Sequence, residues 1–276
     1  MTTTDAAVGR LLICATPIGN LQDVTLRVLT ALAEADVVAC EDTRHTRVLL
    51  ERHGLQAALV SFHEHNEAPR ARELVGRMRA GATVALVSDA GTPLISDPGY
   101  QLLRACIDAD IPVEVLPGPS AVVSALIASG EPAAQWRFAG FLPRKRSELK
   151  ELLAGAGETL VAFESPRRLP ATLALLAELD PERRVAVCRE LTKRHEEVRR
   201  GSAAELAGAY VSPPRGEVVL VIGAAPPARA GREQALESLR ELIGAGAKAR
   251  PAAAAVAKLT GISANELYRQ LTRGGQ

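Results

Sequence analysis

The residues best suited to chemistry gather in one segment, SDAGTPLISDPG, at positions 88–99. This segment directly follows the apolar run TVALV at 83–87 and supplies two carboxylates, Asp89 and Asp97. Its small residues let a ligand approach the backbone closely, and it is longer than the two or three residues or so that a tight turn needs. Because open α/β sheets bind ligands outside the carboxyl ends of their strands, we interpret this loop as part of a binding site.

Two further strand ends carry residues that suit a ligand. One apolar run leads into ATPIGNLQD at 15–23, and another leads into PGPSA at 117–121. In PGPSA a stiff turn feeds a helix starting at Ser120, whose exposed N–H groups suit a carboxylate or phosphate. A plain helix cap is the alternative interpretation of Ser120. Neither segment has the glycine pattern of nucleotide-binding loops, which disfavours a nicotinamide enzyme or a nucleoside triphosphatase.

These loops need a scaffold of alternating strands and helices, and the first 130 residues have that pattern. We predict strands at 11–15, 37–40, 59–62, 83–87 and 113–116, and helices at 24–35, 43–53, 66–80 and 99–109, the first of them with Asp23 as N-cap. Such alternation favours an α/β fold with a mainly parallel sheet covered on both faces.

The pattern restarts near residue 138 as a second α/β domain. We predict strands at 138–142, 159–164, 184–190 and 217–223, helices at 145–155, 167–179 and 202–210, and an extra antiparallel strand or hairpin in the polar segment 190–201. The domains are expected at 1–130, 131–225 and 226–276. The last follows the linker AAPPARAG and resembles a helix-turn-helix unit, with Ser263 capping its final helix. A helical tail packed on the rest of the chain is the alternative.

Composition and charge limit which kinds of protein this chain can be. The 276 residues are 47% hydrophobic and only 3% aromatic, so aliphatic side chains must fill the core. Net charge is −6 over residues 1–136 and +7 over 137–276, which suggests a polyanionic partner for the second half. The four cysteines form no Cys-x-x-Cys pair, and three lie in apolar runs that suit reduced, buried thiols. Without a membrane span or secretory signal, we expect a soluble, cytoplasmic protein.

Six motifs together resemble the ribosomal small-subunit methyltransferase I family. They are TPIGNLQD, EDTRHTRVLL, SDAGTPLISDPG, PGPSA, FAGFLPRK and FESPRR, and the resemblance runs from Arg10 to about Gly223. It implies the tetrapyrrole methylase fold, in which two α/β domains hold S-adenosylmethionine in the cleft between them. It also implies a homodimer that methylates the 2′-hydroxyl of a cytidine in 16S ribosomal RNA of the small ribosomal subunit.

The resemblance also implies which residues contact the cofactor. Ser88 stands where the family commonly has glycine. The implied residues are Pro17, Ser88, Asp89, Ala90, Pro93, Leu94, Ile95, Ser96, Ser120, Ala121, Phe163, Ile222 and Gly223.

A ribose hydroxyl is a poor nucleophile, so a general base or a cation that stabilises the alkoxide should help. We predict Asp42, Arg44 and Lys145 as catalytic residues. Their alternatives are a helix cap for Asp42, an ion pair for Arg44 and a phosphate contact for Lys145. His63 and His65 lack a nearby third ligand, so we predict no metal site.

RNA binding would use a set of cations in the second half of the chain. They are Arg144, Lys145, Arg146, Lys150, Arg167, Arg168, Lys193, Arg194, Arg199 and Arg200.

Two other functions compete with RNA methylation: a tetrapyrrole carbon methylase of the same fold, and a ligand-sensing regulator whose helical tail binds DNA. The basic half disfavours the first, and the full set of cofactor loops disfavours the second.

Overall fold

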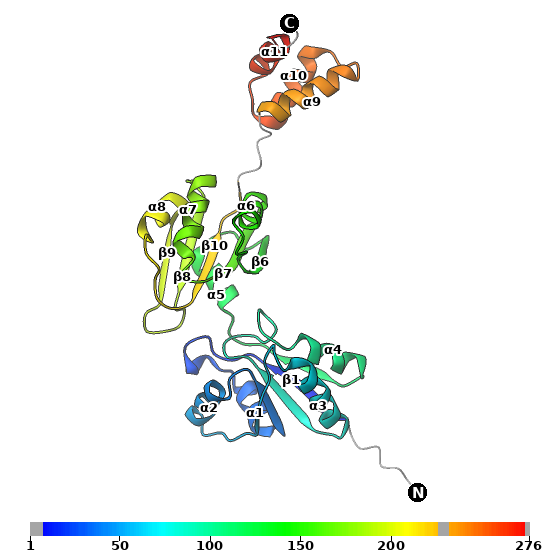
Figure 1. Ribbon diagram of the computed structural model, residues 1–276, viewed down its shortest axis with the longest axis vertical. Coiled ribbons are helices and arrows are strands. Elements are labelled where there is room, and N and C mark those ends of the chain that lie inside the picture. The colour runs from blue at the N-terminus through cyan, green and yellow to red at the C-terminus, as the bar shows by residue number, and fades with distance from the viewer. Residues whose placement is uncertain (1–7, 226–231, 274–276) are drawn as a thin grey trace. The chain divides into compact units, whose positions relative to one another are not determined.

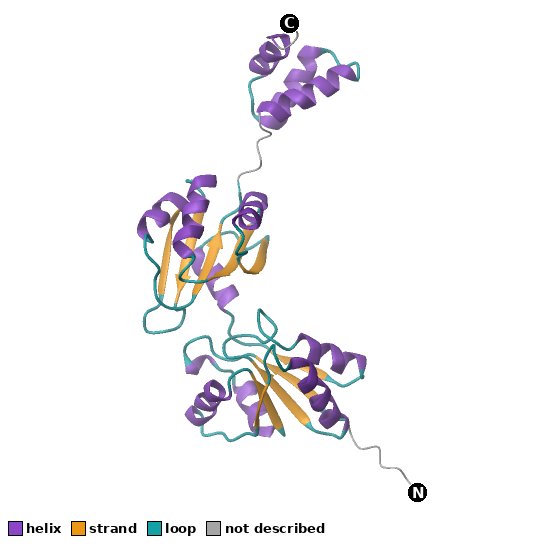
Figure 2. Ribbon diagram, in the orientation of Figure 1, coloured by secondary structure: helices purple, strands orange, loops and turns teal. Residues whose placement is uncertain are grey.

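The structure is a computed structural model that describes residues 8–225 and 232–273 (Figure 1). Contacts divide the chain after residue 224. Two sheets, coloured orange in Figure 2, precede this point, and three helices follow it. No helix in the described part of the chain is long and apolar enough to cross a membrane.

The first sheet is entirely parallel, as predicted. Its order is β3-β2-β4-β1-β5, formed by β1 (Arg10–Cys14), β2 (Val37–Cys40), β3 (Leu59–Ser61), β4 (Thr83–Val87) and β5 (Val113–Leu116). Side chains alternate between two cores, so Leu11 and Ile13 enter one and Leu12 and Cys14 the other. Both cores are buried, which accounts for the continuous apolar runs in these strands.

Four helices cover this sheet on both faces. They are α1 (Leu26–Glu34) and α2 (Thr43–Arg52) on one face, and α3 (Glu67–Arg79) and α4 (Tyr100–Asp108) on the other. The prediction that Asp23 caps the first of these helices is wrong. Asp23 lies in the short 3₁₀ helix Leu21–Asp23, whose N-cap is Asn20. The Thr25 hydroxyl instead accepts a hydrogen bond from the Val28 N–H at 3.2 Å and caps α1.

The second sheet is mixed. Its order is β6-β7-β10-β8-β9, formed by β6 (Trp136–Phe141), β7 (Thr159–Glu164), β8 (Arg184–Arg189), β9 (Glu197–Ser202) and β10 (Val218–Ile222). Only β6 and β7 are parallel neighbours, and β9 confirms the extra antiparallel strand expected from the polar segment. One face packs on α6 (Arg146–Gly155), α7 (Leu169–Leu179) and α8 (Ala203–Ala209), and the other on α5 (Ala121–Ser129).

The C-terminal unit contains α9 (Arg232–Gly244), α10 (Ala249–Thr260) and α11 (Ala264–Arg273). They enclose their own core of Ala235, Leu239, Ala252, Ala253, Val256 and Leu267. The predicted break is present, since α10 ends at Gly261 with φ 72° and α11 starts after Ser263. The linker at 226–231 lies outside the described residues.

Candidate functional site

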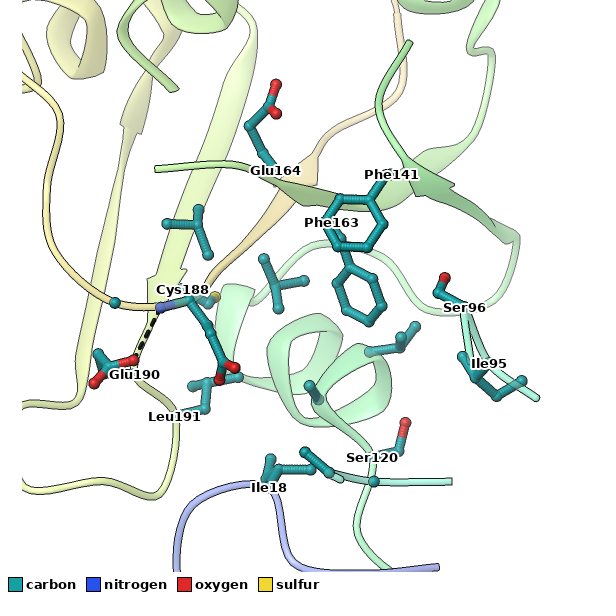
Figure 3. A pocket seen from close by; sticks show the side chains of 18 of the residues that line it. Ile18, Ile95, Ser96, Ser120, Phe141, Phe163, Glu164, Cys188, Glu190 and Leu191 are labelled. Atoms are coloured by element: carbon teal, nitrogen blue, oxygen red, sulfur yellow. Dashed lines mark hydrogen bonds between the residues drawn. The ribbon is translucent and has the colours of Figure 1, made fainter. Parts of the chain in front are cut away.

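A cavity of about 480 Å³ lies where the loops of the first sheet meet one edge of the second. From the first sheet and α5 it is lined by Ile18, Asp89, Ala90, Gly91, Thr92, Ile95, Ser96, Asp97, Ser120, Ala121 and Val122. From the second sheet it is lined by Phe141, Phe163, Glu164, Ser165, Pro166, Cys188, Glu190, Leu191, Gly216, Glu217, Val218 and Val219. Figure 3 shows side chains from both groups pointing toward this space. The volume is in the range of small-molecule sites.

The 88–99 loop is anchored at both ends. Thr16 and Gly91 exchange two backbone hydrogen bonds, of 2.8 and 3.1 Å, which tie the loop to the end of β1. The Ser88 hydroxyl donates to the Gly91 carbonyl at 3.3 Å. At the other end, the buried Glu67 carboxylate accepts the N–H groups of Gly99 and Gln101, at 3.0 and 2.9 Å. These bonds hold the loop in one shape beside the cavity.

Unusual backbone conformations flank the cavity on both sides. Leu94 and Ser96 have φ of 73° and 69° in the first loop, and Glu190 and Thr192 have φ of 53° and 66° after β8. Residues other than glycine rarely adopt positive φ, and each such residue costs about 1–3 kcal/mol. Four of them beside one cavity favour a functional role for it.

Asp89 connects the cavity wall to the next strand end. Its Oδ1 accepts the Asp42 backbone N–H at 3.0 Å, and its Oδ2 lies 3.0 Å from His45 Nδ1. Asp89 thereby fixes the start of α2 relative to the 88–99 loop. It lines the cavity as expected, and both of its oxygens already have protein partners.

Asp97 is the cavity carboxylate with the most perturbed acidity. Burial raises the pKa of Asp97 from 3.8 to about 6, and the negative charges of Glu41 and Asp89 act in the same direction, against the Ser88 hydroxyl. Burial and nearby acidic groups, Asp89 first among them, also raise the pKa of Glu41. A carboxyl group of this acidity can change protonation state near neutral pH, as general bases do.

None of the three predicted catalytic residues lines the cavity. Asp42 accepts the Arg44 N–H at 2.8 Å and the Arg44 guanidinium at 3.0 and 2.5 Å, so the cap and the ion pair are both present. These bonds hold the pKa of Asp42 well below its usual range. Lys145, just before α6, pairs with Glu148 at 2.9 Å.

The predicted cofactor residues fall into three groups. Asp89, Ala90, Ile95, Ser96, Ser120, Ala121 and Phe163 line the cavity; Pro17, Ser88, Pro93 and Leu94 are each next to a lining residue in the chain without lining it; and Ile222 and Gly223 lie away from it. Ser120 is also a helix cap, since its hydroxyl accepts the Val123 N–H at 3.4 Å.

Ile222 and Gly223 require a correction. Because β10 is antiparallel to β7, its first residue Val218 pairs with Glu164, and Ile222 pairs with Leu160 at the opposite edge. Ile222 is fully buried in the core, and the Gly223 carbonyl accepts the Arg183 guanidinium at 2.8 Å. The cavity is bordered by the start of β10, at Gly216–Val219.

Several lining residues were missed in the sequence. Asp97 lies in the loop already singled out, and FAGFLPRK and FESPRR contain Phe141 and Glu164–Pro166, so a local signal existed for these. Cys188, Glu190, Leu191 and Gly216–Val219 had no local signal, because their place depends on antiparallel pairing. Burial raises the pKa of the Cys188 thiol to about 11, which makes it a poor nucleophile.

Many of the predicted RNA-binding cations already have partners. Arg146 pairs with Glu178, Lys193 with Glu190 and Glu217, Arg199 lies over Tyr210, and Arg200 donates to backbone carbonyls. Four of these cations have side chains with no ion-pair or hydrogen-bond partner within the described ranges: Arg144, Lys150, Arg167 and Arg194. Arg144 and Arg167 lie close in sequence to the cavity residues Phe141 and Pro166.

Among the described residues, no group of three or more His, Cys, Asp or Glu side chains is arranged to hold a metal ion.

Comparison with known proteins shows the family to which this chain belongs. Residues 10–207 match the family described as Tetrapyrrole (Corrin/Porphyrin) Methylases. A relative named ribosomal RNA small subunit methyltransferase I, from Mesorhizobium japonicum, is 47% identical over 95% of this chain and 90% of its own. The relative of that name from Thermotoga maritima is 43% identical over 78% of this chain and 98% of its own.

Among solved structures, a uroporphyrin-III-C-methyltransferase from Thermus thermophilus aligns with a TM-score of 0.59 and 26% identity, over 78% of this chain and 94% of that one. The matched residues 10–207 contain all of the first sheet and every strand of the second sheet except β10. The chain belongs to the ribosomal RNA small subunit methyltransferase I family, within the tetrapyrrole methylases.

Proposed function

We propose that this protein transfers a methyl group from S-adenosylmethionine to the 2′-hydroxyl of a cytidine in 16S ribosomal RNA. The observation that carries the proposal is the cavity bordered by SDAGTPLISDPG, in a chain of a family whose members are named small-subunit ribosomal RNA methyltransferases. The side chains that line this cavity match an elongated ligand with a carboxylate, a cationic centre and a flat ring.

The lining residues fit S-adenosylmethionine group by group. The N-terminus of α5, at Ser120–Val122, suits the carboxylate of the methionine part. The carboxylates of Asp89 and Asp97 suit its positive charge, and Phe163 offers a ring to the adenine. When bound, S-adenosylmethionine supplies a methyl group already activated by a sulfonium cation.

Asp97 is the proton acceptor in this proposal. It takes up the proton that the ribose hydroxyl loses as the ribose oxygen bonds to the methyl carbon, and the electron pair of the broken carbon–sulfur bond stays on sulfur. Asp42 is a weak proton acceptor because its pKa is low. We assign Asp42 and Arg44 to positioning the wall that Asp89 holds, and Lys145 to contact with RNA phosphate.

The RNA is proposed to bind through the unpartnered cations Arg144, Lys150, Arg167 and Arg194, which can neutralise phosphates without breaking an existing pair.

We propose residues 1–130 and 131–225 as the two domains that form the cavity, and residues 226–276 as a further RNA-contacting domain. We also propose a homodimer that acts in the cytoplasm. Light scattering after gel filtration tests the oligomeric state.

Nucleoside analysis of the product tests the function. Small ribosomal subunits from cells that lack this activity are incubated with the protein and S-adenosylmethionine carrying a labelled methyl group. The RNA is then digested to nucleosides, and the label should appear in 2′-O-methylcytidine. Label on a base carbon or nitrogen overturns the ribose assignment. Labelling of a porphyrinogen, with none on RNA, supports the tetrapyrrole alternative that the family description raises.

A further inference from the structure

The chain contains only four phenylalanines, and three of them lie together: Phe141 and Phe163 line the cavity, and Phe138 packs against Phe163. The ring of Phe163 is 5.1 Å from that of Phe138 and 5.4 Å from that of Phe141, centre to centre. Phe141 differs from the other two because it is 63% exposed. Figure 3 shows it next to Phe163, with Glu190 and Leu191 across the cavity.

A β-bulge places Phe141 at this position. Phe138 pairs with Val161, so a regular register would put Gly140 opposite Phe163, but Phe141 pairs with Phe163 instead. The extra residue moves Phe141 to the face of the sheet that carries Phe138 and Phe163. Gly140, with φ 65°, allows the irregular backbone. Bulges of this kind often redirect a side chain beside an active site.

The segment after Phe141 is fixed, so the ring is held in place. The Leu142 N–H donates to the Phe163 carbonyl at 3.0 Å, and the Leu142 side chain is buried. The Arg168 guanidinium donates to the Leu142 and Pro143 carbonyls at 3.0 and 2.5 Å. A large apolar ring is therefore kept in solvent by a rigid frame, which costs free energy unless a ligand covers it.

The neighbouring charges indicate what that ligand is. Arg144 follows Phe141 by three residues, is exposed, and has no partner among the described residues. An exposed aromatic face beside a free guanidinium suits a nucleotide, with the base on the ring and the phosphate on the cation. Phe163 is the more buried of the two rings and remains for the cofactor, whereas Phe141 faces molecules that arrive from solvent.

We propose that Phe141 is the platform on which the base of the target nucleotide stacks while its 2′-hydroxyl is methylated. The proposal rests on the function proposed above. The proposal requires the 2′-hydroxyl to reach a methyl donor held inside the cavity, so we expect the target nucleotide to leave its stack. Proteins commonly hold such an unstacked base against an aromatic ring. The stacking replaces contacts that the base loses in the RNA.

Substitution of Phe141 separates this role from cofactor binding. Phe141→Ala and Phe141→Leu remove the aromatic face, and Phe141→Trp keeps it. Tyr100→Ala is the matched control, since Tyr100 is 67% exposed on α4 and does not line the cavity. Calorimetry with S-adenosylhomocysteine measures the cofactor site without RNA. Methyl transfer to small ribosomal subunits from cells lacking the modification gives kcat and KM for RNA.

Phe141→Ala and Phe141→Leu should bind S-adenosylhomocysteine within about twofold of the unsubstituted protein. Their KM for the subunit should rise about 10- to 100-fold, the usual effect of losing one stacked base. Phe141→Trp should restore KM, and Tyr100→Ala should change neither quantity. An equal loss of S-adenosylhomocysteine affinity would assign Phe141 to the cofactor and overturn the proposal, as would an unchanged KM. If the unsubstituted protein methylates no ribose, the proposed function itself fails, which is a separate result.

Discussion

Replacing Asp97 with asparagine should lower activity and raise stability at the same time. The asparagine amide keeps the size of the side chain but cannot accept a proton from the ribose hydroxyl. Loss of a general base usually costs about 10²- to 10⁴-fold in rate, so kcat should fall by at least about a hundredfold. In the unsubstituted protein, activity should follow the ionised fraction of Asp97, whose pKa is about 6. The rate should therefore rise tenfold per pH unit below pH 6 and level off above about pH 7.

The stability change has the opposite sign because burial disfavours the charged form of Asp97. Its pKa is 3.8 ordinarily and about 6 in the folded protein, so the folded state binds more protons between these values. Stability therefore decreases as pH rises through this interval, and the full penalty is present above pH 6. A shift of this size corresponds to about 3 kcal/mol. Because Asp97 is partly open to solvent, screening reduces the penalty to about 1–2 kcal/mol.

Two measurements on the same samples test this reasoning. Initial rates of methyl transfer are recorded from pH 5 to 8.5, and urea unfolding is followed at pH 5 and pH 8. Asp97→Asn should flatten the pH profile, and it should gain more stability at pH 8, where the full penalty on Asp97 is present, than at pH 5, where about half of it is. Asp110→Asn is the matched control, since Asp110 is exposed and its φ of 52° suits asparagine. A variant with the original rate and pH profile would refute the assignment of Asp97 as proton acceptor.

Three further predictions follow from the same contacts. Asp89→Ala should weaken cofactor binding about 10- to 100-fold, because it removes a charged group worth about 1.5–3 kcal/mol and leaves the Asp42 N–H without its acceptor; unchanged affinity by calorimetry contradicts this. Glu67→Ala should lower the free energy of unfolding by about 1.5–3 kcal/mol, because the buried Gly99 N–H loses its partner, and an unaltered urea midpoint would speak against it. A chain that ends at residue 228 should keep its cofactor affinity but bind the small subunit more weakly, most clearly at moderate salt. Equal RNA binding at several salt concentrations, or a joint loss of thermal stability and cofactor binding, excludes that role.

The first sheet and its loops could be predicted because their signals are local. Each of its strands is a short apolar run, and parallel strands all end at the same edge of a sheet. The loop from Ser88 to Gly99 therefore had to lie beside the turn that precedes Ser120. Asp89, Ala90, Ile95 and Ser96 line the cavity for this reason. The sequence left two roles open for Asp42 and Arg44, because the same two side chains could face a ligand or each other.

The second sheet shows what a local pattern cannot determine. The run EVVLVIG at 217–223 is apolar throughout, so it predicts a buried strand but does not say in which direction the strand runs. That direction is determined by pairing with β7 and β8, both of which are antiparallel to it. The reversal exchanges the two ends of the strand, which is why Gly216 borders the cavity and Gly223 does not.

The reversal also explains why a glycine is needed at the start of β10. The Glu190 side chain folds over Gly216, and its Oε1 accepts the Glu217 N–H at 2.9 Å, the contact drawn in Figure 3. A Cβ at position 216 would lie 2.3 Å from the Glu190 carboxyl carbon, so the Glu190 side chain would have to move and give up its bond to the Glu217 N–H. The φ of 89° at Gly216 also disfavours other residues. Glu190 itself has a positive φ, so a strained residue just after β8 and a glycine just before β10 together border this side of the cavity.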